Sequence, residues 1–113
     1  MKPTKVIIHC SDTENGKYVS IETIRKWHIF GRGFNDIGYH LLINPDGSHD
    51  LGRPYNVVGA HVEHENSDSI GICLIGKNRF TLKQFDTLKY HLQGILMTYS
   101  IPPWEIYCHY EFK

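Results

Sequence analysis

Histidine is the residue type in this sequence best suited to do chemistry. The chain has 113 residues, of which eight are histidines. Neutral imidazole is the commonest metal ligand in proteins and the usual general base. Two histidines adjoin short apolar runs, His9 in KVIIHC and His109 in IYCHYEF. These two are the first candidates for a metal or catalytic site, and a structural, hydrogen-bonded role at a strand end is the alternative for each.

Strand geometry limits what the neighbouring cysteines can do. Successive side chains of a strand point to opposite faces of the sheet. Cys10 therefore cannot share a site with His9, nor Cys108 with His109, unless a bulge re-aims one of them. The three cysteines, with Cys73, are widely spaced and form no CxxC. We expect all three to be small buried hydrophobic residues rather than disulfide partners.

The elements that position these residues follow from hydrophobic periodicity and turn signals. We expect strands at residues 5–10, 37–43, 48–52, 69–75 and 104–110, and helices at residues 20–31 and 81–99. Ser20 should cap the first helix, and Thr81 with Gln84 should form a capping box for the second. The run SIGICLI predicts a central strand buried on both faces. The sequence therefore predicts an α/β fold, with a central mixed β-sheet flanked by helices.

Helical spacing also predicts which side chains pack on the sheet. The expected apolar positions are Ile21, Ile24, Trp27 and Phe30 in the first helix, and Leu82, Phe85, Leu88, Leu92, Ile95, Leu96 and Tyr99 in the second.

Composition excludes some partners. Twelve Lys and Arg balance twelve Asp and Glu without a basic run, so no electrostatic surface for nucleic acid or an anionic membrane is expected. The length fits one domain, residues 1–113. The first apolar run is short and is followed immediately by His9, so we expect neither a signal peptide nor a membrane span. We therefore expect the protein to be synthesised in the cytoplasm. The sequence carries no signal for an oligomeric state.

Four motifs in a fixed order carry a resemblance to a known family. They are IIHCSDT, IRKWHIFGRGFNDIGYHLLINPDGSHDLGRP, VGAHVEHENSDSIGICLIG and CHYEF. From Val6 to Phe112 the chain resembles the zinc-dependent N-acetylmuramoyl-L-alanine amidases, which include amidase-type phage lysozymes and the catalytic peptidoglycan recognition proteins. The resemblance implies a peptidoglycan hydrolase that cleaves the amide bond between N-acetylmuramoyl and L-alanine. It also implies Zn²⁺ as cofactor, bacterial peptidoglycan as partner, and action on the cell wall after release or export.

The resemblance assigns roles to five residues. It makes His9 and His109 zinc ligands, Tyr39 the active-site tyrosine, and His61 and Asn66 substrate contacts at the rim of a groove. A zinc ion with three protein ligands keeps an open position for water and polarises a carbonyl. A nearby phenol can hydrogen-bond the water or the developing oxyanion.

The residues alone leave other interpretations open. Tyr39 is otherwise a core aromatic of a half-buried strand, on the same face as Ile37, Leu41 and Ile43. His61 and Asn66 are otherwise turn-capping residues of a surface loop. The histidines that match no family position, His28, His40, His49 and His91, are expected to be structural or surface residues.

The sequence departs from the family pattern after the second histidine. Phage-type amidases continue with a catalytic lysine and a zinc-binding cysteine in a Lys-x-Cys-Pro string, whereas Lys113 comes only four residues after His109. We therefore expect an amidase-like domain without the family's C-terminal segment, an incomplete zinc site and little activity in this chain. His61 or Asp12 could supply a third ligand from a loop. The alternative function is a non-catalytic peptidoglycan-binding module.

Overall fold

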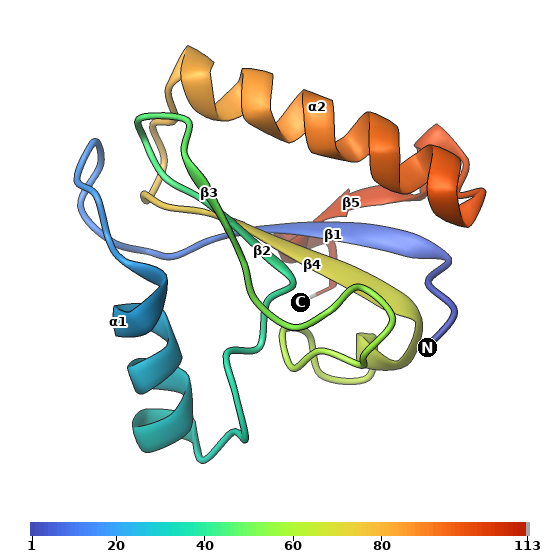
Figure 1. Ribbon diagram of the computed structural model, residues 1–113, viewed down its shortest axis with the longest axis horizontal. Helices are drawn as coiled ribbons and strands as arrows, with labels where there is room; N and C mark the ends of the chain where they lie inside the picture. Colours follow the sequence, from blue (N-terminus) through green and yellow to red (C-terminus); the bar gives the residue numbers. More distant parts are fainter. Residues whose placement is uncertain (113) are drawn as a thin grey trace.

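In the computed structural model, which describes residues 1–112, a five-stranded sheet carries helices on both faces (Figure 1). The strands are β1 (Lys5–Cys10), β2 (Leu41–Ile43), β3 (His49–Leu51), β4 (Ser69–Leu74) and β5 (Ile106–Cys108). The helices are α1 (Ile21–Lys26) and α2 (Leu82–Tyr99), with a π-helical turn η1 (Trp27–Gly31) and short 3-10 turns η2 (Asn66–Asp68), η3 (Pro103–Glu105) and η4 (His109–Phe112). The predicted α/β class is confirmed.

The sheet is mixed, as expected, with the order β3-β2-β4-β1-β5. Strand β1 pairs in parallel with both β4 and β5, and β2 pairs in parallel with β4. Only β3 runs antiparallel to its neighbour, β2. All six residues of β4 are buried, which confirms the two-sided burial predicted from SIGICLI. Because β1 lies between two parallel neighbours, the carboxyl ends of all three strands open at the same edge of the sheet.

Each face of the sheet has its own hydrophobic core. Helix α2 covers one face and α1 lies on the other side (Figure 1). The core under α2 is formed by Val6, Leu41, Ile43, Ile70, Ile72, Leu74, Leu88, Ile95 and Ile101. The core on the α1 side is formed by Ile21, Ile24, Ile37, Leu42, Cys73 and Ile75. Because side chains alternate along β2 and β4, each of these strands contributes residues to both cores.

Strands β2 and β5 are each four residues shorter than expected, whereas β3 and β4 are shorter by only two residues and one residue. One expectation about Tyr39 is wrong as a result. Strand β2 begins only at Leu41, and Tyr39 lies in the bent segment before it. Tyr39 packs against the core on the α1 side, whereas Leu41 and Ile43 belong to the core under α2. The prediction of a common face assumed that side chains alternate without interruption from Tyr39 to Ile43, and the bend interrupts this alternation. Strand β5 likewise ends at Cys108, so His109 opens a turn instead of continuing the strand.

The predicted apolar faces of the helices are also wrong in part. Trp27 is 49% exposed, and Phe30 and Leu82 are each 82% exposed. The first helix continues from α1 into η1, where wider i→i+5 turns change which positions face the sheet. His28 is buried there instead, and its Nδ1 accepts a hydrogen bond from the backbone N–H of Gly38 at 2.8 Å.

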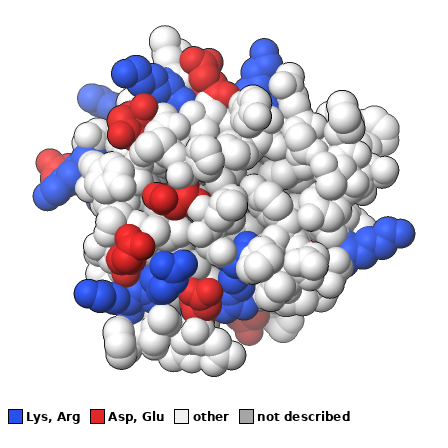
Figure 2. Space-filling model, viewed as in Figure 1, with Lys and Arg blue, Asp and Glu red and all other residues white. Residues whose placement is uncertain are grey.

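Charged residues of both signs are mixed over the face drawn in Figure 2, in agreement with the balanced composition. Figure 2 shows Lys and Arg interspersed with Asp and Glu, and a broad uncharged region on the right of that face. Within residues 1–112, neither helix has the length and apolar character needed to cross a membrane.

Gln84 ties the start of α2 to the sheet. Its fully buried side chain donates from Nε2 to the carbonyl oxygens of Ile43 at 3.1 Å and Ile75 at 2.9 Å. Its Oε1 accepts the backbone N–H of Thr81 at 2.9 Å, and Thr81 Oγ1 accepts the backbone N–H of Gln84 at 3.1 Å. The predicted capping box is confirmed, and one of its members also bridges β2 and the end of β4.

The double role of Gln84 predicts an unequal pair of variants. Gln84→Leu removes three hydrogen bonds, to the carbonyl oxygens of Ile43 and Ile75 and from the N–H of Thr81, although the Ile43 oxygen still accepts the backbone N–H of Ile75 at 2.9 Å. We therefore expect the free energy of unfolding to fall by about 3 kcal/mol. Thr81→Ala removes the cap and the hydrogen bond that Thr81 Oγ1 donates to the Pro45 carbonyl oxygen at 2.6 Å, and should cost about 2 kcal/mol. Denaturant unfolding followed by circular dichroism measures both. Equal costs for the two variants would contradict the bridging role of Gln84.

Candidate metal and catalytic site

His9 and His109 meet at the carboxyl edge of the sheet. Ile8 of β1 pairs with Cys108 of β5, so the next residues of the two parallel strands, His9 and His109, emerge side by side. Their ring centroids lie 4.5 Å apart with the planes tilted by 55°. His9 and His109, which the sequence analysis proposed as a pair, are therefore in contact although most of the chain separates them.

His61 approaches the same pair from the loop before β4. Its Nδ1 lies 2.9 Å from His9 Nε2, and its Nε2 lies 3.2 Å from Ser69 Oγ and 3.4 Å from the Ser69 carbonyl oxygen. Asn66 shapes this loop, because its Oδ1 accepts the backbone N–H groups of His61 and Val62, each at 2.9 Å. His61 is thus held by a fixed loop and has partners at both ring nitrogens.

Tyr39 also packs against His9. The two ring centroids are 5.2 Å apart, and Tyr39 also packs 5.2 Å from the ring of His28. Burial raises the pKa of the Tyr39 phenol well above its usual range, and the neighbouring Cys73 thiol adds to the effect. The phenol therefore keeps its proton at neutral pH and can donate a hydrogen bond.

Burial keeps the central histidines neutral. Burial lowers the pKa of His9 to about 2. The neighbouring His61 and His109 lower this pKa further, because positive charges so close together would repel one another. Burial likewise lowers the pKa of His61 to about 4, with His40 the next contributor. A neutral imidazole has one nitrogen with a free lone pair, which is the form that binds metals or takes up protons.

Two cavities flank the cluster and share His109. One, of about 430 Å³, has an apolar wall from Phe80, Phe85 and Leu88 and reaches His9 and His109. The other, of about 420 Å³, is lined by Arg32, Phe34, Ala60, His61, Val62, Glu63, Asn66 and His109. His61 and Asn66 thus lie in the wall of an open cavity beside the histidine pair.

Imidazole nitrogens are suitable ligands for zinc, but the site offers fewer of them than a catalytic zinc ion ordinarily has. His9 and His109 supply two imidazoles, whereas a catalytic zinc ordinarily has three protein ligands. Among residues 1–112, no group of three or more His, Cys, Asp or Glu side chains is placed to hold a metal ion. The ring nitrogens of His61 already have partners, and Asp12 is 80% exposed beside Lys77, so neither loop residue completes the set here.

The cysteines differ from expectation. Cys73 is buried in β4, as predicted, but Cys10 and Cys108 are exposed, so the expectation of three buried thiols is wrong for these two. Both line the cavity that reaches His9 and His109. Each is the last residue of its strand, and Cys10 points away from the face on which its neighbour His9 is buried.

The four histidines that match no family position make contacts within the fold. His40 is fully buried, with Nδ1 accepting the backbone N–H of Gly71 at 3.0 Å and Nε2 lying 2.7 Å from the Val57 carbonyl oxygen. His49 and His91 pack against each other at 4.4 Å on the α2 side of the sheet. Sequence reasoning missed Ser69 and Gly71, whose small side chains give no chemical signal by themselves.

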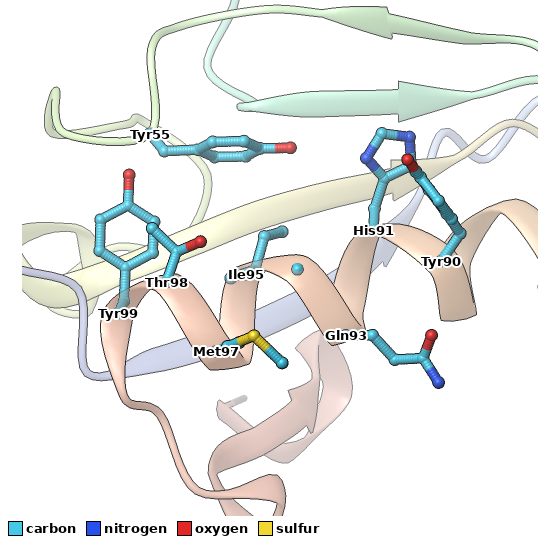
Figure 3. Close-up of a pocket in the computed structure, with 9 residues that line it drawn as sticks. Tyr55, Tyr90, His91, Gln93, Ile95, Met97, Thr98 and Tyr99 are labelled. Carbon is cyan, nitrogen blue, oxygen red and sulfur yellow. The ribbon is translucent and has the colours of Figure 1, made fainter.

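A third cavity lies away from the histidine cluster, between α2 and the loop after β3. Figure 3 shows the Tyr55 ring beside α2, on the side where Ile95, Thr98 and Tyr99 project. The cavity measures about 390 Å³ and has no charged residue in its lining. None of the five residues assigned by resemblance lines it, so the candidate site is confined to the carboxyl edge of the sheet.

The fold and the histidine cluster place the chain among α/β domains with a histidine-rich site at the edge of a mixed sheet. Comparison with known proteins identifies which of these it is. The chain belongs to the N-acetylmuramoyl-L-alanine amidase family, which matches residues 1–113.

Individual relatives agree with this family. The endolysin of Klebsiella phage KP32 is 34% identical over 105 residues, which cover 86% of this chain and 69% of that protein. The amidase LysC from Clostridium intestinale has a similar structure, with a TM-score of 0.89, 27% identity and coverage of 99% of this chain and 73% of LysC. Drosophila melanogaster peptidoglycan-recognition protein LE, in complex with tracheal cytotoxin, gives a TM-score of 0.85 at 28% identity, covering 99% of this chain and 71% of that chain.

The neutral histidines predict a pH dependence of stability. The pKa values of His9 and His61 are lower in the folded protein than in the unfolded chain, where they are about 6.5. As the pH falls below about 6.5, the unfolded chain binds protons first, so stability is lost. We expect the metal-free protein to lose up to about 1.4 kcal/mol per pH unit for each such histidine between about pH 6.5 and 4.

Denaturant unfolding at several pH values, with a chelator present, measures this slope. His61→Gln should reduce the slope of stability against pH by the contribution of one histidine, which is up to about 1.4 kcal/mol per pH unit. His64→Asn is the matched control, because the His64 side chain is 88% exposed and asparagine accepts its positive φ. Stability that is constant or rises from pH 6.5 to 4.5 would contradict the buried neutral histidines.

Proposed function

We propose that the histidine cluster is the zinc and catalytic centre of an amidase that cleaves the bond between N-acetylmuramoyl and L-alanine in peptidoglycan. The observation that carries the proposal is the contact between the His9 and His109 rings at the carboxyl edge of the sheet. Family membership supports the reaction, and the relatives named as endolysins support the bacterial cell wall as the place of action. The complex of protein LE with tracheal cytotoxin, a monomeric diaminopimelic acid-type peptidoglycan, supports a muramyl peptide as ligand.

In this proposal His9 and His109 hold the metal, and burial keeps His9 in the neutral form that a metal binds. Zinc at such a site polarises a carbonyl and lowers the pKa of bound water. Tyr39 keeps its phenolic proton and is placed to donate a hydrogen bond to negative charge that develops on the scissile amide. The two cavities beside His109 provide room for the substrate on either side of the reacting bond.

Binding without cleavage is the second candidate function. It is favoured by one observation, that residues 1–112 place no third protein ligand with His9 and His109. A histidine pair alone leaves zinc weakly held. The cavities that would contact a muramyl peptide do not depend on the metal, so wall binding would persist when cleavage is lost.

The two candidates differ in what they do to purified cell walls. We expect the 113-residue chain to sediment with walls and to release little peptide. A chain extended by a family-type segment with Lys-x-Cys-Pro should bind zinc at one equivalent and release peptides in a chelator-sensitive way. Wall binding by both chains, without release by the extended one, would support the binding module and contradict the amidase.

Two single variants in the extended chain separate metal binding from chemistry. His109→Ala should abolish stoichiometric zinc together with activity. Tyr39→Phe should keep zinc and lower the rate by roughly 10²–10³, as expected for loss of one donor to an oxyanion. Full activity in His109→Ala would show that the metal site lies elsewhere.

A further inference from the structure

The hydrogen bonds around Ser69 fix where the proton of His61 lies. Ser69 Oγ is 2.5 Å from the carbonyl oxygen of Glu65, which can only accept, so the hydroxyl proton is committed to that bond. Ser69 Oγ can then only accept from His61 Nε2, 3.2 Å away. The Ser69 carbonyl oxygen, 3.4 Å from the same nitrogen, is also an acceptor. His61 therefore carries its hydrogen on Nε2.

The proton on His61 in turn fixes the tautomer of His9. A neutral imidazole has one donor and one acceptor, so His61 Nδ1 is an acceptor. It lies 2.9 Å from His9 Nε2, which must therefore be the donor. The hydrogen of neutral His9 is on Nε2, and the lone pair of Nδ1 is the one left available at the carboxyl edge of the sheet.

The position of His61 is itself tightly determined. Asn66 Oδ1 accepts two successive backbone N–H groups, those of His61 and Val62, and so fixes the loop on which the ring stands. The ring lies directly over Gly71 of β4, where an added Cβ would come within 2.5 Å of His61 Cγ. Any larger residue at position 71 would have to displace the imidazole from this position.

We propose that His61 is a positioning residue. Its Nε2–H donates to the acceptors at Ser69 and its Nδ1 accepts from His9 Nε2, which leaves His9 Nδ1 as the metal-binding atom. We call this chain of hydrogen bonds from His9 through His61 to Ser69 the relay. The identity of the ligand rests on the proposed zinc function, whereas the direction of the relay does not. Partners of this kind, which hold the second nitrogen of a metal-binding histidine, set its tautomer and ring orientation. His61 would thus act on the metal through His9 without contacting it.

The tautomer can be read directly in the metal-free protein. Long-range ¹H–¹⁵N correlation of the histidine rings distinguishes a protonated nitrogen from a bare one. At neutral pH we expect both His9 and His61 to be protonated on Nε2 and bare on Nδ1. A wild-type His9 protonated on Nδ1 would overturn the proposal, and this measurement requires neither a variant nor a metal.

Three substitutions test the relay itself. His61→Leu removes the acceptor, and Gly71→Ala displaces the ring while keeping the imidazole. Each should produce a mixture of His9 tautomers in the metal-free protein. In the extended chain, each should also weaken the Zn²⁺ affinity roughly ten- to hundredfold in a chelator competition. Ser69→Ala, which keeps the backbone carbonyl, should give a smaller change in the same direction and is the fallback if His61→Leu does not fold.

The controls separate a positioning role from general destabilisation. Gly94→Ala adds the same methyl group on α2, where nothing lies within 4 Å, and should leave the His9 tautomer and the zinc affinity unchanged. An unchanged His9 tautomer and an unchanged zinc affinity in folded His61→Leu would overturn the proposal. Absence of zinc binding by the extended chain would contradict the proposed metal site, and the metal-free spectra would still decide the relay.

Discussion

The placement of β1 between two parallel strands is the constraint on which the candidate site depends. Parallel pairing with β5 brings His9 and His109 out at one edge, although most of the chain separates them. Parallel pairing with β4 sets Gly71 and Ser69 beside β1, under the loop that carries His61. If β5 ran antiparallel, its carboxyl end would lie at the opposite edge of the sheet and the pair would not form.

Burial then determines the chemistry that the cluster can perform. Imidazoles removed from water favour the neutral form, and each of them needs a defined hydrogen-bond partner. His28 and His40 meet this requirement by accepting backbone N–H groups from Gly38 and Gly71, so they stabilise the chain where strands and bends meet. His9 instead finds its partner in His61, another side chain. The same physical demand thus produces structural histidines at two positions and a candidate metal ligand at a third.

The supporting elements are specified by polar groups as much as by the hydrophobic cores. Gln84 fastens α2 to β2 and to the residue that follows β4, and Asn66 fastens the loop before β4. Both side chains hydrogen-bond to backbone groups, and a backbone group without a partner is costly in a protein interior. The rigidity of the carboxyl edge comes from these side-chain-to-backbone bonds, and the histidine geometry follows from that rigidity.

The sequence by itself determined the fold class, the central position of β4, both helix caps and the candidates His9, Tyr39 and His109. These features depend on local patterns of two or three residues, or on motifs readable in order along the chain. Only the tertiary structure decided that Tyr39 stands in a bend, that Cys10 and Cys108 are exposed, and that His61 hydrogen-bonds His9. A bend resets the alternation of side chains, and a contact between a loop and a strand depends on strand order. Neither is encoded in the spacing of residues along the chain.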